Sequence, residues 1–202
     1  MNVFDQIYGA NIWGCGSGHG SLPSVTKGYR RFLEDFLKTK RIKSVVDFGC
    51  GDWQFSRLIK WGDVKYVGLD VVPAVIERNN KKFASNTVSF RSIAGFSDLP
   101  QAELLIVKDV LQHLQTDDIK AFLETVVPNY PYALITNCVT PVGILNREIN
   151  NGDFRPLDLR KPPFEVDAEE VFSFRVPRRW LWRKWEFLMG STKIVLLINN
   201  HG

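Results

Sequence analysis

Cysteine and histidine are scarce in this sequence. The three cysteines, Cys15, Cys50 and Cys138, are widely spaced and form no C-x-x-C pair. A disulfide framework or a structural zinc site is therefore not expected. The three histidines are too scattered for a metal-binding motif, and we expect no bound metal.

Long apolar runs are also missing. None approaches the roughly 18 residues of a membrane span, and the first residues do not show the basic start and apolar stretch of a signal peptide. We therefore expect a cytoplasmic protein with no membrane span. The net charge of +4 permits acidic or phosphorylated partners without requiring them. A chain of 202 residues with 45% hydrophobic content is expected to form a single domain over residues 1–202.

Helix and strand patterns alternate along the chain. Apolar residues three and four positions apart predict an amphipathic helix over 26–39. The other expected helices are 55–61, 73–83 and 117–127, and the expected strands are 44–48, 65–70, 87–91, 104–108, 132–137, 171–174 and 193–198. Alternation of this kind predicts an α/β fold, with a parallel sheet covered by helices on both faces.

The most informative segment is a glycine turn that follows the first strand. Gly49 permits backbone angles that a side chain forbids, and Gly51 lets the turn approach a ligand closely. Asp70 ends the second strand, 19 residues after Gly51 (70 − 51), where a carboxylate accepts hydrogen bonds from ribose hydroxyls. Because parallel strands end at one edge of a sheet, these residues predict a nucleoside-cofactor pocket.

The turn does not fit a dinucleotide well. The dinucleotide fingerprint has a third glycine where this chain has Gln54. Asp47, two residues before Gly49, suits a ligand that carries an ammonium group better than a pyrophosphate. An NAD-dependent dehydrogenase is therefore a weaker interpretation than a protein that binds S-adenosylmethionine, which carries an ammonium and a sulfonium.

Three segments resemble motifs of the class I S-adenosylmethionine-dependent methyltransferases. Residues 47–51 (DFGCG) resemble the first motif, 69–71 (LDV) the ribose-binding strand end, and 105–114 (LIVKDVLQHL) the fourth-strand motif. The resemblance covers about residues 26–138. It implies a Rossmann-like, mostly parallel seven-stranded sheet with helices on both faces and an antiparallel last strand, and S-adenosylmethionine as cofactor.

The resemblance also implies which residues bind the cofactor. They lie in the glycine turn and at the ends of the second and fourth strands: Asp47, Gly49, Cys50, Gly51, Gln54, Asp70, Val71 and Lys108. Trp53 stands where many members have a third glycine, which suggests an aromatic wall beside the cofactor. Residues 92–94 (SIA) stand where an acidic residue often meets the adenine amino group.

Catalytic chemistry is expected after the fourth strand. Asp109 follows that strand directly, and His113, four residues later, shares a helical face with it if a turn begins there. Either residue is a candidate for removing a proton from a hydroxyl acceptor. The alternative is that Asp109 caps the turn and His113 packs beneath it.

Residues 1–25 are expected to form a lid. Four glycines alternate with small or polar residues between Trp13 and Ser21, and such a strip is able to close over a ligand. We expect Trp13 and Ser17 in the lid, Ser17 near the substrate, and Tyr29 or Arg30 near the methionine carboxylate of the cofactor. A disordered terminus is the alternative.

Residues 138–168 are expected to form a long insertion on the substrate side, because they contain four prolines and little helical periodicity. Within it, Arg155 and Asp158 suggest a donor and acceptor pair for a polar substrate. A surface ion pair that organises the loop is the alternative. Asn137, at the preceding strand end, is a further candidate for substrate binding.

Residues 175–185 interleave arginine with tryptophan. This mixture suits nucleic acid or a membrane surface, whereas ordinary packing buries the tryptophans and leaves the arginines in water.

The sequence therefore predicts a methyltransferase that uses S-adenosylmethionine to methylate a hydroxyl of a small polar molecule, such as a sugar or another metabolite. RNA or protein methylation is the enzymatic alternative, with nucleic acid bound through 175–185. A nucleotide-binding scaffold without turnover is the non-enzymatic alternative. The sequence predicts no oligomeric state.

Overall fold

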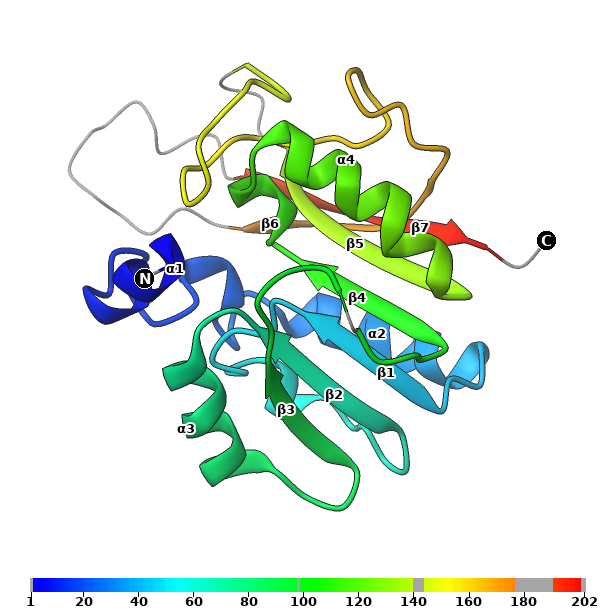
Figure 1. Ribbon diagram of the computed structural model, residues 1–202. Coiled ribbons are helices and arrows are strands. Elements are labelled where there is room, and N and C mark those ends of the chain that lie inside the picture. Colours follow the sequence, from blue (N-terminus) through cyan, green and yellow to red (C-terminus); the bar gives the residue numbers. More distant parts are fainter. Residues whose placement is uncertain (1, 98, 140–143, 177–190, 201–202) are drawn as a thin grey trace.

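The computed structural model describes residues 2–97, 99–139, 144–176 and 191–200. The strands of this part form one sheet in the order β3-β2-β1-β4-β5-β7-β6 (Figure 1). Their bounds are β1 Ser44–Phe48, β2 Lys65–Asp70, β3 Val88–Ser92, β4 Leu104–Lys108, β5 Tyr132–Val139, β6 Glu169–Val176 and β7 Ser191–Asn199. The α-helices are α1 Val3–Gly9, α2 Lys27–Thr39, α3 Pro73–Phe83 and α4 Thr116–Thr125.

The sheet is parallel except at its last strand. β1 pairs in parallel with β2 and β4, whereas β7 runs antiparallel to both β5 and β6. All five residues of β4 are buried, as expected for a central strand covered on both faces. The strand order reverses between β1 and β4, which opens a crevice at the carboxyl ends of these strands. The predicted fold class is confirmed.

Helices cover both faces of the sheet, and each face has its own core. Leu33 of α2 and Ile76 of α3 belong to the cluster on one face. Ile119 and Phe122 of α4 belong to the cluster on the other face. Neighbouring residues of one strand alternate between the clusters, as Leu104 and Leu105 of β4 do, because successive side chains of a strand point to opposite faces.

The prediction of a helix over 55–61 is wrong. Only one 3-10 turn, η2 (Ser56–Leu58), forms there. Phe55, Ile59 and Trp61 are nevertheless all buried in the α2-face cluster, and the indole N–H of Trp61 donates to the Ser56 carbonyl at 2.8 Å. The apolar spacing therefore reflects burial of an irregular segment.

The described part of the late insertion after β5, residues 144–168, contains no helix or strand, as expected, but it is anchored in the core. Leu157 and Leu159 are fully buried in the α4-face cluster, and Leu157 N–H donates to the Cys138 carbonyl at 2.9 Å. Of the basic and aromatic stretch, only Arg175 and Val176 fall within β6. The rest of 175–185 lies outside the described residues.

No helix within the described residues has the length and apolar character needed to cross a bilayer. Within the same ranges, no three or more histidine, cysteine, aspartate or glutamate side chains are grouped so that they could hold a metal ion.

Candidate functional site

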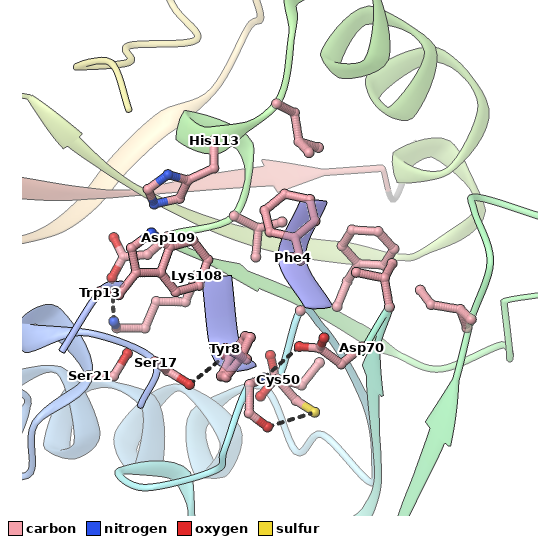
Figure 2. Close-up of a pocket in the computed structure, with 18 of the residues that line it drawn as sticks. Phe4, Tyr8, Trp13, Ser17, Ser21, Cys50, Asp70, Lys108, Asp109 and His113 are labelled. Carbon is pink, nitrogen blue, oxygen red and sulfur yellow. Dashed lines mark hydrogen bonds and ion pairs between the residues drawn. The ribbon is translucent and has the colours of Figure 1, made fainter. Parts of the chain in front are cut away.

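A pocket opens at the carboxyl edge of the sheet (Figure 2). It encloses about 870 Å³ of space between protein atoms, including its open mouth. Its lining comes from the N-terminal segment, the glycine turn, the end of β2, the loop after β3 and the segment after β4.

The glycine turn and the end of β2 touch each other in this pocket. Gly51 N–H donates to Oδ2 of Asp70 at 3.0 Å, and Val72 N–H donates to Oδ1 at 3.0 Å. Burial raises the pKa of Asp70 to about 6, although both backbone bonds oppose this rise. Val71 and Cys50 line the same wall. The strand order thus brings the expected residues together at one site.

Both glycines of the turn have positive φ angles, +74° at Gly49 and +55° at Gly51, which glycine adopts without strain. A Cβ at Gly51 would strike the Ser17 and Tyr8 hydroxyls. The missing side chain therefore lets the N-terminal segment lie against the turn, and a close approach of the turn to a ligand stays a prediction.

Asp47 lines the pocket and is 4% exposed. The Tyr66 hydroxyl donates to its Oδ2. Burial raises the pKa of Asp47 to about 6, and the Tyr66 bond and the positive charge of Lys108 limit the rise. Asp47 therefore titrates within two pH units of neutrality.

Two lysines hold Asp109. Nζ of Lys108 lies 2.6 Å from Oδ2 of Asp109, and Nζ of Lys193, from β7, pairs with Oδ1. Burial alone would raise the pKa of Asp109, but the two ammonium groups lower it to about 2. A carboxyl group with this pKa is a weak base, so the expectation that Asp109 removes a proton conflicts with its surroundings.

Lys108 lines the pocket beside Asp109, but its ammonium group is also engaged elsewhere. It donates to the Gly20 carbonyl at 3.2 Å and lies 4.9 Å from the centre of the Phe55 ring. Burial lowers the pKa of Lys108, and Asp109 opposes that shift. Lys108 thus links β4 to the N-terminal segment.

His113 lines the opposite end of the pocket from Asp70 (Figure 2). It ends the 3-10 helix η3 (Leu111–His113). The expected shared helical face does not form, because Asp109 has φ +60° and precedes the helix. Trp13 packs on the His113 ring with ring centres 5.0 Å apart. Burial lowers the pKa of His113, which favours the neutral ring at neutral pH.

The N-terminal segment lines the pocket and consists of α1 followed by turns. Phe4, Tyr8, Trp13, Ser17 and Ser21 all line the cavity. The Ser17 hydroxyl donates to Asp52 Oδ1 at 2.7 Å and accepts from Asp52 N–H at 2.9 Å. Ser17 thus fastens the segment to the glycine turn, and its hydroxyl is already engaged by protein groups.

Three residues expected at the cofactor lie elsewhere. Trp53 is buried in the core, with its ring centre 5.1 Å from that of Phe83 and 5.2 Å from that of Phe90, so it forms no aromatic wall at the pocket. The Gln54 amide donates to the Cys15 carbonyl at 2.8 Å. Arg30 donates to the Pro23 carbonyl at 3.2 Å. The contacts of Gln54 and Arg30 stabilise the N-terminal segment instead.

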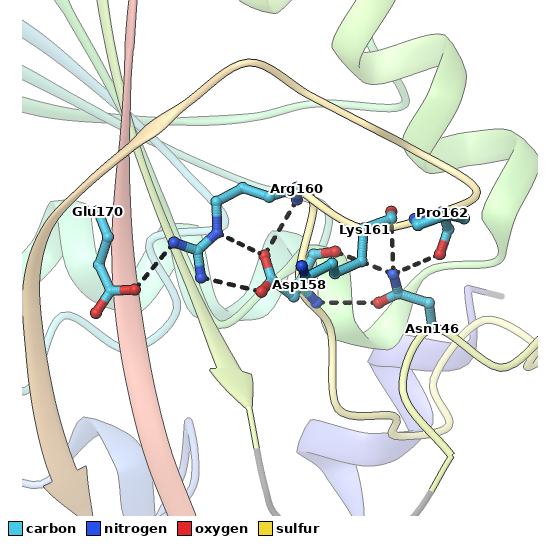
Figure 3. A network of polar contacts seen from close by, with 6 residues as sticks. All are labelled: Asn146, Asp158, Arg160, Lys161, Pro162 and Glu170. Carbon is cyan, nitrogen blue, oxygen red and sulfur yellow. Dashed lines mark hydrogen bonds and ion pairs between the residues drawn. The ribbon is translucent and has the colours of Figure 1, made fainter.

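Arg155 and Asp158 do not form the expected pair. Arg155 is fully buried and donates to the carbonyls of Leu114 and Arg147 at 2.6 and 2.8 Å. Asp158 accepts from Nε and Nη2 of Arg160, each at 3.0 Å (Figure 3). Each side chain fixes the insertion, so neither supports the expected contact with a substrate.

Asn137 is 1% exposed on β5, and its amide has no hydrogen-bond partner in the part of the chain that the structure describes. It pairs in register with Ile194 of β7. Its role in substrate binding stays a prediction.

Sequence reasoning missed α1 and Lys193. α1 begins with a capping box, in which Phe4 N–H donates to the Asn2 side chain and Asn2 N–H donates to Asp5; Asn followed three residues later by Asp is a readable start signal. Lys193 directly precedes the apolar run 194–198 of the last strand, and nothing in the sequence marks it as the partner of Asp109.

No family model and no curated protein sequence matches the chain. Solved structures do match it. The N-methyltransferase NodS from Bradyrhizobium japonicum, in complex with S-adenosyl-L-homocysteine, is 13% identical, with 90% of this chain and 89% of that chain covered and a TM-score of 0.61.

Two further structures match with lower TM-scores. Magnesium protoporphyrin IX methyltransferase (ChlM) from Synechocystis, with bound S-adenosyl-L-homocysteine, is 14% identical over 84% of this chain and 82% of that chain, with a TM-score of 0.55. The methyltransferase domain of a bacterial Hen1 is 13% identical over 84% and 97%, also with a TM-score of 0.55. The chain therefore has the fold of the class I S-adenosylmethionine-dependent methyltransferases.

Proposed function

We propose that the protein is a methyltransferase that uses S-adenosylmethionine. The observation that carries this proposal is the single pocket that brings together the glycine turn, Asp70 and His113. The structures of NodS and ChlM, which share the fold, contain S-adenosyl-L-homocysteine, and this supports the same cofactor here.

The residues of the pocket fit this cofactor chemically. Asp70 suits the ribose hydroxyls, since a carboxylate accepts several hydrogen bonds. Val71, Ile93 and Phe96 line the same cavity and offer apolar contacts to adenine where an acidic residue is absent. Asp47 supplies negative charge for the ammonium group.

When bound, the cofactor supplies an electrophilic methyl group. The protein's part is to hold the acceptor close and to exclude water. Trp13 and the rest of the N-terminal segment cover the cavity, which suits that task. For the acceptor we propose a hydroxyl of a small polar molecule, because His113 lines the cavity and a neutral imidazole takes up a proton near neutral pH.

Calorimetric titration of the protein with S-adenosylmethionine, S-adenosylhomocysteine and NAD tests the cofactor. We expect binding of the first two and none of NAD. Asp70→Ala is expected to weaken S-adenosylmethionine binding at least about tenfold, or about 1.4 kcal/mol, whereas Asp63→Ala, at an exposed site, leaves it unchanged. Affinity for NAD alone would refute the proposal.

Methyl transfer tests the reaction. Incubation with radiolabelled S-adenosylmethionine and a set of hydroxylated metabolites, structured RNA and a cell protein extract separates the acceptor classes. Label in a small molecule supports the proposal. Label only in RNA or protein would favour the alternative enzymes, and binding without transfer to any class would favour a scaffold.

A further inference from the structure

The late insertion contacts η3 at the residues next to the pocket. Gly152 N–H donates to the His113 carbonyl at 2.8 Å, and Arg155 N–H donates to the Gln112 carbonyl at 3.1 Å. Between these two bonds, the carbonyl of Asp153 lies 2.8 Å from Nδ1 of His113. The insertion thus holds both the backbone and the ring of His113.

The contact at Nδ1 decides which nitrogen of the ring carries the proton. A backbone carbonyl only accepts hydrogen bonds, so Nδ1 of His113 must be the protonated nitrogen. In a neutral ring, Nε2 is then unprotonated and its lone pair accepts a hydrogen bond. An unconstrained imidazole in water favours the opposite form, with the proton on Nε2.

Gln112 fixes the same form from the other side of the ring. Its Oε1 accepts the Cys138 N–H at 2.8 Å, which leaves its NH₂ group toward His113. Nε2 of Gln112 lies 3.4 Å from Nε2 of His113. An amide NH₂ only donates, so this contact also requires an unprotonated Nε2. The distance is long, and a hydroxyl acceptor can replace this bond with a shorter one.

We propose that Nε2 of His113 is the base that takes the proton of a hydroxyl acceptor, and that Gln112 and the Asp153 carbonyl are the groups that hold it in the Nδ1–H form. Gln112 acts through His113 and is therefore a positioning residue. This inference deepens the proposed function and rests on it for the reaction. The arrangement of the ring does not depend on any cofactor.

In this proposal the acceptor binds as a protonated hydroxyl. In the transfer, the acceptor O–H bond breaks, its proton passes to Nε2 of His113, and its electron pair forms the O–CH₃ bond while the electrons of the S–CH₃ bond stay on sulfur. The imidazolium then releases its proton to water.

Burial, more than the charged groups around it, favours a neutral ring of His113 at rest. Burial lowers its pKa most, the Asp153 carbonyl and the Asp109 carboxylate oppose that shift, and Lys193 from β7 adds to it. Trp13 from the N-terminal segment and Phe154 from the insertion cover the ring without charge, with ring centres at 5.0 and 5.8 Å.

Long-range ¹H–¹⁵N NMR of the histidine rings shows which ring nitrogen of His113 is protonated. The measurement uses the full chain without substrate or cofactor. The chain has three histidines, so His113→Gln identifies the signals of His113. At pH 7.5 we expect Nδ1 protonated and Nε2 unprotonated. Signals from a ring with Nε2 protonated and Nδ1 bare would overturn the proposal.

Gln112→Glu is the sharper variant, because it keeps an oxygen for Cys138 N–H and places a carboxylate oxygen beside Nε2. We expect His113 to become doubly protonated at pH 7.5, and methyl transfer to fall at least about tenfold. Gln101→Glu, an exposed control, is expected to change neither. Unchanged ring signals in Gln112→Glu would contradict the role of Gln112.

The two proposals fail separately. A protein that shows the expected ring signals but binds no S-adenosylmethionine would refute the proposed function and leave the ring assignment intact. A protein that binds and turns over S-adenosylmethionine with Nε2 protonated at rest would refute the base and leave the proposed function intact. If Gln112→Glu does not fold, the wild-type spectrum alone decides.

Discussion

At the scale of single residues, the sequence predicts which residues lie at the pocket better than it predicts which side chains form ion pairs. Asp70 and Gly51 were predictable because strand order alone brings the ends of β1 and β2 together. The partners of Asp109 were not, because Lys193 comes from a strand 84 residues later (193 − 109) and nothing local signals the pairing. Asp158 differs, because its partner is the local residue Arg160, two residues later (160 − 158), and not Arg155.

The first prediction concerns the ion pairs of Asp109. Asp109→Asn preserves the side-chain shape and tolerates the positive φ, but it leaves the buried ammonium groups of Lys108 and Lys193 without a counter-charge. We expect the free energy of unfolding in urea to fall by about 3 to 5 kcal/mol.

A second substitution checks the cause of that loss. Lys193→Met in the Asp109→Asn background removes one of the two uncompensated charges, so it is expected to recover part of the stability. A double variant as unstable as the sum of the two single variants would mean that the charges do not interact.

The second prediction concerns pH. Burial raises the pKa values of Asp47 and Asp70 to about 6, so each carboxyl group gains a proton as the pH falls through 6. A protonated Asp47 loses its attraction for an ammonium group. We expect the dissociation constant of S-adenosylmethionine to rise about tenfold or more between pH 7.5 and pH 5, about one factor of ten per pKa unit.

The stability of the fold depends on pH in the opposite direction to cofactor affinity. A raised carboxyl pKa stabilises the fold below the unfolded value and loses that contribution as the pH rises through about 6. The neutral, buried His113 opposes this trend, because its lowered pKa destabilises the fold as the pH falls below the unfolded value.

Comparison of the wild type with Asp47→Asn isolates the contribution of the Asp47 carboxyl group to the pH dependence of cofactor affinity. A variant with the same pH dependence of cofactor affinity as the wild type would exclude Asp47 as a cause.

At the scale of elements, strands were predicted well and irregular segments poorly. β1, β2 and β4 match the expected ranges because short apolar runs between turn residues have few other structures open to them. The segment 55–61 has the spacing of a helix but packs as a 3-10 turn. The glycines of the N-terminal strip suggested flexibility, whereas Gly14, Gly16 and Gly18 have positive φ angles in defined turns.

The third prediction concerns the segment that covers the pocket. Ser17→Ala removes the hydroxyl that bonds twice to Asp52. Each bond contributes about 0.5 to 1.5 kcal/mol, so the segment is expected to open more often. Limited proteolysis between residues 10 and 20 should become faster in this variant and slower in the wild type with S-adenosylmethionine.

Ser173→Ala, at an exposed position of β6, is the matched control and should be cleaved at the wild-type rate. A cofactor that left the cleavage rate of the wild type unchanged would contradict a lid that closes over it.

At the scale of the whole molecule, the order of strands determines where function can lie. The reversal between β1 and β4 places the cavity beside the glycine turn, and the insertion after β5 reaches back to hold η3 at that cavity. The fold and the end of the pocket near Asp70 follow from periodicity and motif. The end near His113 does not, because the N-terminal segment and η3 line it and the insertion holds η3, and these segments meet only in three dimensions.

The most direct measurement is a crystal structure of the protein grown with S-adenosylhomocysteine. The expected result is electron density in the pocket, with the ribose on Asp70, the amino group toward Asp47 and the sulfur nearer to His113 than the adenine is. Density bound at another surface, or an empty pocket in protein shown by calorimetry to bind the ligand, would contradict the claim that this cavity holds the cofactor.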